Sequence, residues 1–186
     1  IKAGFKTLLI GIESPHDRIL KQLNKGFNSA EVRQYFLTLN KYNFYYHGYF
    51  IYGNISETED EMLYIADFAK DIGLDSITFL KLRIEKFSPL KEIVEETPGY
   101  YIGNNGLVYS DRYSSGDLKK IGKKIKFAFY RPGRFLHMFK KCFVDVRFFT
   151  FTEALSFLLV MPKVLKSVIA REIEQGRLTD ALKRTF

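Results

Sequence analysis

The chain has 186 residues, 46% of them apolar, which is enough for a globular domain with a sizeable core and excludes a disordered chain. Its single cysteine, Cys142, excludes an intrachain disulfide and any cysteine-ligated zinc or iron–sulfur site made by this chain alone, and favours a reducing, cytoplasmic setting. The net charge of +8 suits an anionic partner, but no apolar run reaches the roughly 20 residues of a membrane-spanning helix.

The chain starts with Ile1 and an apolar run that lacks the organisation of a signal peptide, so we expect it to begin inside a longer polypeptide. Residues 7–12 (TLLIGI) are apolar without alternation, which predicts a strand covered on both faces. Ser14 and Pro15 follow as a helix cap and a first-turn proline. The next helix is expected from residue 28 or 29, with an approximate capping box.

Two further strands alternate with helices. Residues 45–52 (YYHGYFIY) predict the second strand, and Thr58 with Glu61 forms a capping box that opens a helix through residue 71, with Gly73 as its C-cap. Residues 76–82 (SITFLKL) predict the third strand. This alternation predicts parallel strands joined by right-handed crossovers. Three strands do not close a barrel, so we expect the missing strands upstream, beside the open sheet edge.

The character of the sequence changes after Pro98 and Gly99. Residues 100–113 are a loop region with a β-hairpin at 104–106. Helices are predicted over 115–130, 134–143 and 152–174, the last bent at Pro162. We therefore divide the chain into an α/β region, 1–97, and a mainly helical extension, 98–186.

Most of the positive charge lies in this extension, where residues 119–147 contain one acid, Asp145. Such a patch can meet a polyanion or an anionic membrane surface, but the preferred interpretation is a solvated face or an interdomain contact. The basic residues are Lys119, Lys120, Lys123, Lys124, Lys126, Arg131, Arg134, Lys140, Lys141 and Arg147.

Parallel α/β proteins bind ligands at the carboxyl ends of their strands. Glu13 follows the first strand at this edge. A carboxylate there can accept hydrogen bonds from both hydroxyls of a ribose, or it can be a solvated or ion-paired acid. Residues 11–28, GIESPHDRILKQLNKGFN, closely resemble the fourth strand and following helix of radical S-adenosylmethionine (SAM) enzymes. The resemblance is strongest to members with an N-terminal cobalamin-binding domain.

Three further segments extend the resemblance. Residues 49–62, YFIYGNISETEDEM, look like the fifth strand and its G-x-P-G-E-T turn, with Ile55 and Ser56 in place of Pro and Gly. Residues 77–93 occupy the place of the sixth strand, with a weaker match. Residues 127–132, FAFYRP, resemble an F-Y-x-R-P signature in the helical tails of the cobalamin-binding relatives.

The resemblance implies the C-terminal half of a partial (β/α) barrel with a helical C-terminal appendage. It implies that Glu13 hydrogen-bonds the SAM ribose, that Lys25 approaches the SAM carboxylate and that Ser14 caps the helix beside the ligand. Tyr49 would lie near the ribose, and the backbone of 82–84 would border adenine. The implied cofactor-binding residues are Glu13, Ser14, Lys25, Tyr49, Leu82 and Arg83.

The chemistry implied by the resemblance is reductive cleavage of SAM by a [4Fe-4S] cluster, which gives a 5′-deoxyadenosyl radical for hydrogen abstraction or methylation. The family's C-x-x-x-C-x-x-C ligands are not in this chain, so no metal ligand or catalytic residue is assigned. Either they lie in a missing N-terminal half, or the protein is a degenerate relative without a cluster. The expected partners are that half, cobalamin through a further N-terminal domain, a small-molecule substrate and an electron donor.

Two alternatives stay open. A nonenzymatic basic module would bind an anionic membrane or nucleic acid; against nucleic acid, Phe127, Phe129 and Tyr130 adjoin one another and suggest packing. A radical SAM methylthiotransferase fits the sequence motifs GIES (residues 11–14) and FAFYRP (residues 127–132) less well. The histidines lie at no metal-ligand spacing and are interpreted as structural: His16, His47 and His137. The candidate interfacial helix contains Leu155, Leu158, Leu159, Lys163, Leu165, Lys166 and Ile169.

Overall fold

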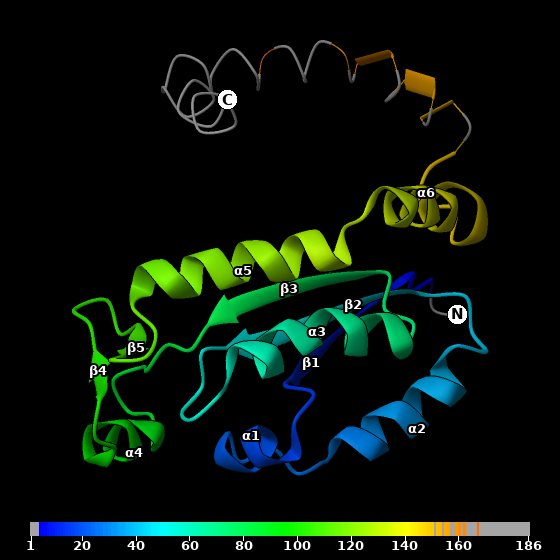
Figure 1. Cartoon of the computed structure of the whole chain (residues 1–186). Helices are drawn as coiled ribbons and strands as arrows, with labels where there is room; N and C mark the ends of the chain where they lie inside the picture. The colour runs from blue at the N-terminus through cyan, green and yellow to red at the C-terminus, as the bar shows by residue number, and fades with distance from the viewer. Residues whose placement is uncertain are drawn as a thin grey trace. The chain divides into compact units, whose positions relative to one another are not determined.

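The chain divides into two units, Ile1–Val146 and Arg147–Phe186, in the computed structural model. The described residues are 4–150, 152, 153, 155, 156, 159, 160, 162 and 167, and every element labelled in Figure 1 belongs to the first unit. Most of the helix predicted over 152–174 therefore lies outside the described residues, as do Leu158, Lys163, Leu165, Lys166 and Ile169 of the candidate interfacial helix. The domain boundary at 97/98 stays a prediction.

Three parallel strands form the main sheet, in the order β1-β2-β3 (Figure 1). The strands are β1 (Thr7–Glu13), β2 (Tyr45–Tyr52) and β3 (Ser76–Lys81). The helices between them are α1 (Asp17–Gln22), α2 (Ser29–Leu39) and α3 (Glu59–Asp71). The predicted alternation of strand and helix is confirmed, and it makes the fold α/β. Among the described residues the sheet is open, with β1 and β3 at its edges.

Local capping fixes where two of these helices begin. The predicted capping boxes are confirmed at α2, where Asn28 pairs with Glu31, and at α3, where Thr58 pairs with Glu61. The predicted cap at Ser14 is wrong, because α1 begins at Asp17 with His16 at the N-cap. The chain is still turning at Ser14, whose N–H donates to the Ile12 carbonyl at 2.9 Å. The Ser14 hydroxyl accepts from the His16 N–H at 3.1 Å and so holds the turn that precedes the helix.

A second group of elements follows the sheet. The predicted hairpin is confirmed as an antiparallel pair, and a short helix before it, α4, was not predicted. The elements are α4 (Leu90–Glu96), β4 (Tyr100–Ile102), β5 (Val108–Ser110), α5 (Ser115–Phe129), α6 (Pro132–Lys140) and the π-helical turn η1 (Lys141–Asp145). Leu82, Val94 and Val108 join α4 and the hairpin in a small core beyond the end of β3.

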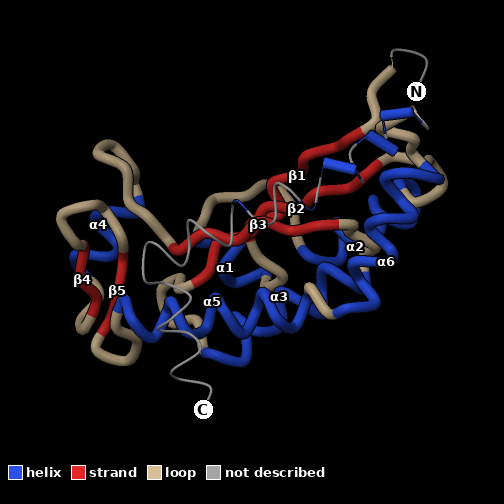
Figure 2. The backbone as a smooth tube through the Cα atoms, turned by 90° about the horizontal axis from the view of Figure 1, so that it is seen from above, coloured by secondary structure: helices blue, strands red, loops and turns tan. Residues whose placement is uncertain are grey.

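The two faces of the sheet differ in cover. Figure 2 shows α3 and α5 on one side of the strands, and the side chains that point there, including Tyr46 and Phe50 of β2, form the main core. The prediction that β1 is covered on both faces is wrong, since Leu9 is 63% exposed. We call the other side the open face, and its residues are Leu9, Gly11, His47, Tyr49, Thr78 and Leu80. None of the described helices is long and apolar enough to cross a membrane.

Candidate functional site

Glu13 is turned onto the open face by its backbone. The register between β1 and β2 shifts between Gly11 and Glu13, and Glu13 has a φ of 71°, in the left-handed region that side chains other than glycine seldom adopt. The carboxylate folds back over Gly11, where an added Cβ would lie only 2.8 Å from Glu13 Oε1. Backbone strain of this kind concentrates at functional sites. Position 11 must therefore lack a side chain if the carboxylate is to keep this place.

Lys25 holds the carboxylate from the other side. Its Nζ lies 3.0 Å from Glu13 Oε1, and the two side chains are only 33% and 17% exposed. Asn24 follows the C-cap of α1 and has a φ of 52°, the left-handed conformation common for a residue after a helix. This conformation turns Lys25 back toward β1. The second oxygen, Glu13 Oε2, has no hydrogen-bond partner within the described part of the chain. One carboxylate oxygen is thus anchored and the other is open to a ligand.

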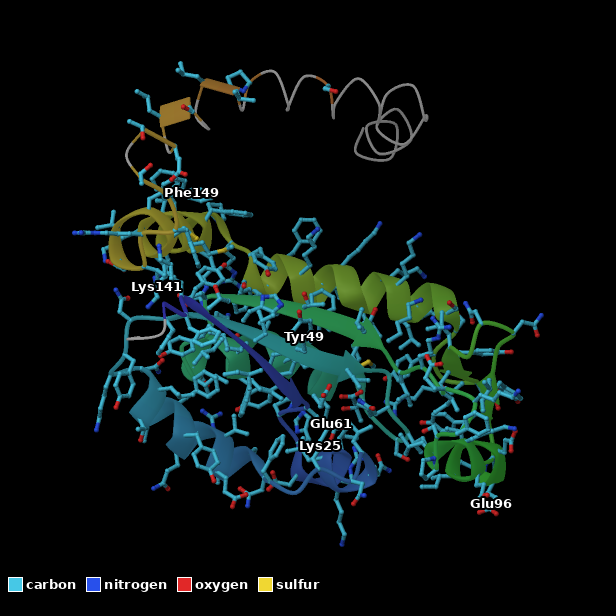
Figure 3. The ribbon with its side chains drawn as sticks, turned by 180° about the vertical axis from the view of Figure 1, so that it is seen from behind. Lys25, Tyr49, Glu61, Glu96, Lys141 and Phe149 are labelled. Atoms are coloured by element: carbon cyan, nitrogen blue, oxygen red, sulfur yellow. The ribbon has the colours of Figure 1, made fainter. Side chains whose placement is uncertain are left out.

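Tyr49 lies beside this pair. It is the register partner of Gly11, and its side chain is 37% exposed on the open face. The ring of His47 supports it edge-on at 4.8 Å and is itself held by Ser76 Oγ at 2.6 Å and Thr78 Oγ1 at 3.0 Å. Burial lowers the pKa of His47, so the imidazole is neutral at pH 7. Figure 3 shows Tyr49 over the strands and Lys25 past the end of β1.

The remaining predicted site residues do not join this group through their side chains. Leu82 is buried in the small core, and both its backbone polar groups are engaged, its N–H by Tyr52 and its carbonyl by Val108. The exposed Arg83 guanidinium pairs with Glu85 at 3.3 Å. Ser14 is fully buried. The structure therefore brings Glu13, Lys25 and Tyr49 together and places the other three in the supporting frame.

The loop after β2 contains a buried acid, Glu57, which the sequence analysis placed in the turn that resembles G-x-P-G-E-T. Glu57 is 2% exposed, and its Oε2 accepts from the backbone N–H and the side-chain amide of Asn54 at 2.9 Å and 3.0 Å. Glu57 Oε1 and Asn54 Oδ1 are both buried without a partner among the described residues. Burial raises the pKa of Glu57 even though these hydrogen bonds oppose the shift. Ionisation of Glu57 therefore destabilises the folded state.

Glu57→Gln is expected to raise the free energy of unfolding at pH 7 by about 1 kcal/mol. Because the folded-state pKa of Glu57 is raised, its contribution is full below the ordinary value of 4.5 and is lost as the pH rises through the folded-state pKa. The amide keeps an acceptor for Asn54 and carries no charge. Urea denaturation at pH 4.5 and pH 7 should show the gain at pH 7 alone, while Glu57→Leu, which leaves the Asn54 N–H unpaired, should destabilise at both. Equal effects of Gln and Leu would contradict the account.

No protein-family model matches the chain, and no curated protein matches it. The assignment of its function therefore depends on the site itself. Among the described residues, no three His, Cys, Asp or Glu side chains gather into a group that could hold a metal ion. This part of the chain does not contain the ligands of an iron–sulfur cluster.

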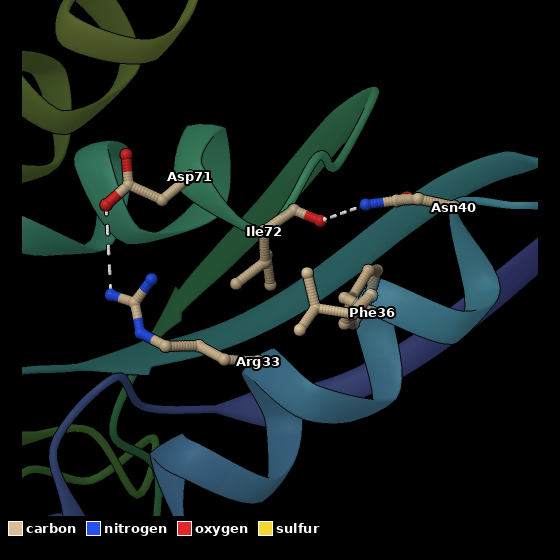
Figure 4. A pocket seen from close by; sticks show the side chains of 6 residues that line it. Arg33, Phe36, Asn40, Asp71 and Ile72 are labelled. Carbon is tan, nitrogen blue, oxygen red and sulfur yellow. Dashed lines mark hydrogen bonds and ion pairs between the residues drawn. The ribbon is translucent and has the colours of Figure 1, made fainter.

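A pocket of about 270 Å³ opens between α2 and the end of α3 (Figure 4). Its polar groups are already partnered within the protein: Arg33 lies 3.8 Å from Asp71, and the Asn40 amide donates to the Ile72 carbonyl at 3.0 Å. Gly73, with a φ of 86°, makes room for Asn40 there. These contacts join the two helices, so we assign this pocket to helix packing and not to ligand binding.

Sequence reasoning missed Asp75, which lies just before β3 and is 2% exposed. Its Oδ2 accepts from the Tyr46 N–H at 2.8 Å, and its Oδ1 accepts from His137 Nε2 at 2.9 Å. The signal was its position, because Asp75 directly precedes the third predicted strand, which begins at Ser76. Burial raises the pKa of Cys142, as the charge of Asp75 also does, which makes Cys142 a poor nucleophile.

Proposed function

We propose that the chain is the SAM-binding and substrate-facing half of a radical SAM enzyme. The observation that carries the proposal is the Glu13 carboxylate, which Lys25 anchors at the carboxyl end of β1 while Oε2 stays open on the open face. A carboxylate at this place suits a ribose diol, since it can accept from both hydroxyls. The arrangement agrees with the role that the resemblance gives Glu13.

The residues present fit a bound nucleoside. Gly11 makes room for the Glu13 carboxylate, and Tyr49 offers a partly exposed aromatic ring one strand away. Lys25 would remain paired with Glu13 and would add positive charge for the SAM carboxylate. Arg83 and the chain around it would border the adenine. SAM and a [4Fe-4S] cluster would supply the radical chemistry, while this chain would orient SAM and exclude water.

The β2–α3 loop gives a second line of support. Gly53 has a φ of 77° and Ser56 a φ of 59°, so both take the left-handed conformation. The resemblance aligns these residues with the two glycines of the G-x-P-G-E-T turn. Ser56 adopts this conformation although it is strained for a residue with a side chain, and its N–H donates to the Tyr100 hydroxyl at 2.6 Å. The turn thus has the backbone shape that the aligned glycines favour, although the second glycine is replaced.

The proposal places the cluster ligands in an N-terminal half of the same polypeptide that pairs with β1. Among the described residues, the outer edge of β1 is unpaired in the sheet, and an apolar pocket of about 260 Å³ lies beside it, lined by Ile10 to Ile12 and by residues of α2 including Val32. An unpaired strand edge next to an apolar groove suits a further strand and its helix. Cobalamin, the electron donor and the small-molecule substrate would be bound by or with that half, since no residue here is assigned to them.

The test is SAM binding by the purified full-length polypeptide, which includes the N-terminal half, prepared without oxygen and measured by isothermal titration calorimetry. We expect Glu13→Gln to weaken SAM binding roughly tenfold, because the amide loses the charged acceptor and the ion pair with Lys25. The matched control is Glu95→Gln, which neutralises an exposed acid of α4 that pairs with Lys91 and lies outside the proposed site. Its SAM affinity should equal that of the wild type. SAM binding that is absent, or is unchanged in Glu13→Gln, would overturn the proposal.

A further inference from the structure

The apolar side of helix α6 faces solvent, and its polar side faces the rest of the unit. Phe135, Leu136 and Phe139 are 58%, 75% and 50% exposed, and no residue of α6 is buried. Their spacing of one and four residues puts the three on one side of the helix. We call these residues the outer stripe. A helix that served only this domain's core would direct such a stripe inward, so the outer stripe serves something outside the unit.

The inward side of α6 is polar and firmly held. His137 bonds to the buried Asp75, and the half-buried Arg134 guanidinium lies 4.7 Å from the centre of the Phe129 ring. The Tyr130 hydroxyl, just before α6, bonds to both the N–H and the carbonyl of Ile77. Rotating the helix to bury the outer stripe would break these contacts. The exposure of the stripe is therefore built into the fold.

Unpaired positive charge lies on α5, the helix before α6, and at Arg131, the N-cap of α6. Helix α5 leads into α6 (Figure 1), and the described part of the chain provides no acidic partner for its exposed Lys119, Lys123 and Lys126, nor for Arg131. Phe127, between these cations, is 74% exposed. Exposed aromatic and leucine side chains next to basic residues are what an interfacial membrane helix presents. The aliphatic part of the stripe does not suit nucleic acid, whose bases stack on aromatic rings.

We propose that the outer stripe of α6, together with Arg131 and the exposed lysines of α5, docks the protein on an anionic lipid surface. The occupant is chosen by charge. Residues 147–186 contain seven Lys and Arg against four Asp and Glu, so the net charge of this segment does not complement the cations, whereas that of an anionic bilayer does. A second copy of the chain would do the same. This inference does not depend on SAM binding.

The chain has no tryptophan, so one can be introduced as a reporter. Leu136→Trp should emit as an exposed tryptophan in buffer and shift to the blue on addition of vesicles of phosphatidylcholine with phosphatidylglycerol, but not of phosphatidylcholine alone. Leu37→Trp is the matched control, since Leu37 is 72% exposed on α2, and its emission should stay unchanged. Emission of Leu136→Trp that is already blue in buffer would overturn the proposal, because protein would then cover the stripe. Concentration dependence of that emission would identify a second copy as the cover.

Binding is then measured with the full chain by vesicle sedimentation. We expect Leu136→Ser to weaken binding to the anionic vesicles roughly tenfold, the loss expected for one buried leucine. Leu37→Ser should bind as the wild type does. Binding should also fall several-fold between about 0.05 M and about 0.5 M salt, because the attraction of the cations is screened. Equal binding to neutral and anionic vesicles, or no effect of Leu136→Ser, would overturn the proposal.

Discussion

Asp75→Ala is expected to lower the free energy of unfolding by about 3 kcal/mol, the loss typical of breaking a buried charged hydrogen-bond network. Asp75 is 2% exposed and joins the start of β2 to α6 through the Tyr46 N–H and the His137 ring. The substitution would leave the Tyr46 N–H buried without an acceptor. It would also remove the nearby negative charge that opposes the burial-induced lowering of the Arg134 pKa.

Urea denaturation followed by circular dichroism measures this loss. Asp71→Ala is the matched control, because Asp71 is 55% exposed and its contact with Arg33 is long, at 3.8 Å; the expected cost is below about 0.5 kcal/mol. His137→Ala should cost about 1 kcal/mol and should be less than additive with Asp75→Ala, since the two share one hydrogen bond. A cost below about 1 kcal/mol for Asp75→Ala would show that Asp75 does not anchor α6.

The parts of the fold that the sequence predicted are those that local chemistry decides. The capping boxes at Asn28 and Thr58 involve residues three apart, and β2 is bounded by a polar turn on each side, so both were found from the pattern alone. Helix α4 was missed because it is short and depends on one buried contact of Val94 with distant strands. The orientation of α6 depends on Asp75, 62 residues from His137, which no periodicity reveals.

The candidate site was only partly predictable for the same reason. Glu13 and Lys25 were named from a resemblance, but their contact is made by two residues in the left-handed conformation, Glu13 itself and Asn24. Composition and spacing do not predict a positive φ at a residue other than glycine. The burial of Glu57 and its unpartnered oxygen likewise depend on tertiary packing that the turn motif does not specify. The sequence pattern thus located both acids, but the folded backbone determines which contacts their carboxylates make.

Neighbouring residues of β2 point to opposite faces of the sheet, so we expect that stability and SAM binding can be changed separately. Gly48 points into the main core, where an added Cβ would lie 2.4 Å from Leu74 Cδ1 and 3.1 Å from Phe50 Cε2. Gly48→Ala should therefore lower the free energy of unfolding by about 2 kcal/mol through overpacking. Gly26→Ala, at a position with no atom within 4 Å of the added carbon, should change it by less than about 0.5 kcal/mol.

Tyr49, the next residue, points to the open face and should behave in the opposite way. Tyr49→Ala removes a ring that is 37% exposed, so it should cost less than about 1 kcal/mol of stability while weakening SAM binding several-fold. Gly48→Ala, measured where the protein is still folded, should bind SAM as the wild type does, because its added carbon lies on the other side of the strand. Loss of SAM affinity in Gly48→Ala but not in Tyr49→Ala would place the ligand on the helix side of the sheet. The opposite result would tie SAM binding to the open face, where Glu13 and Tyr49 lie.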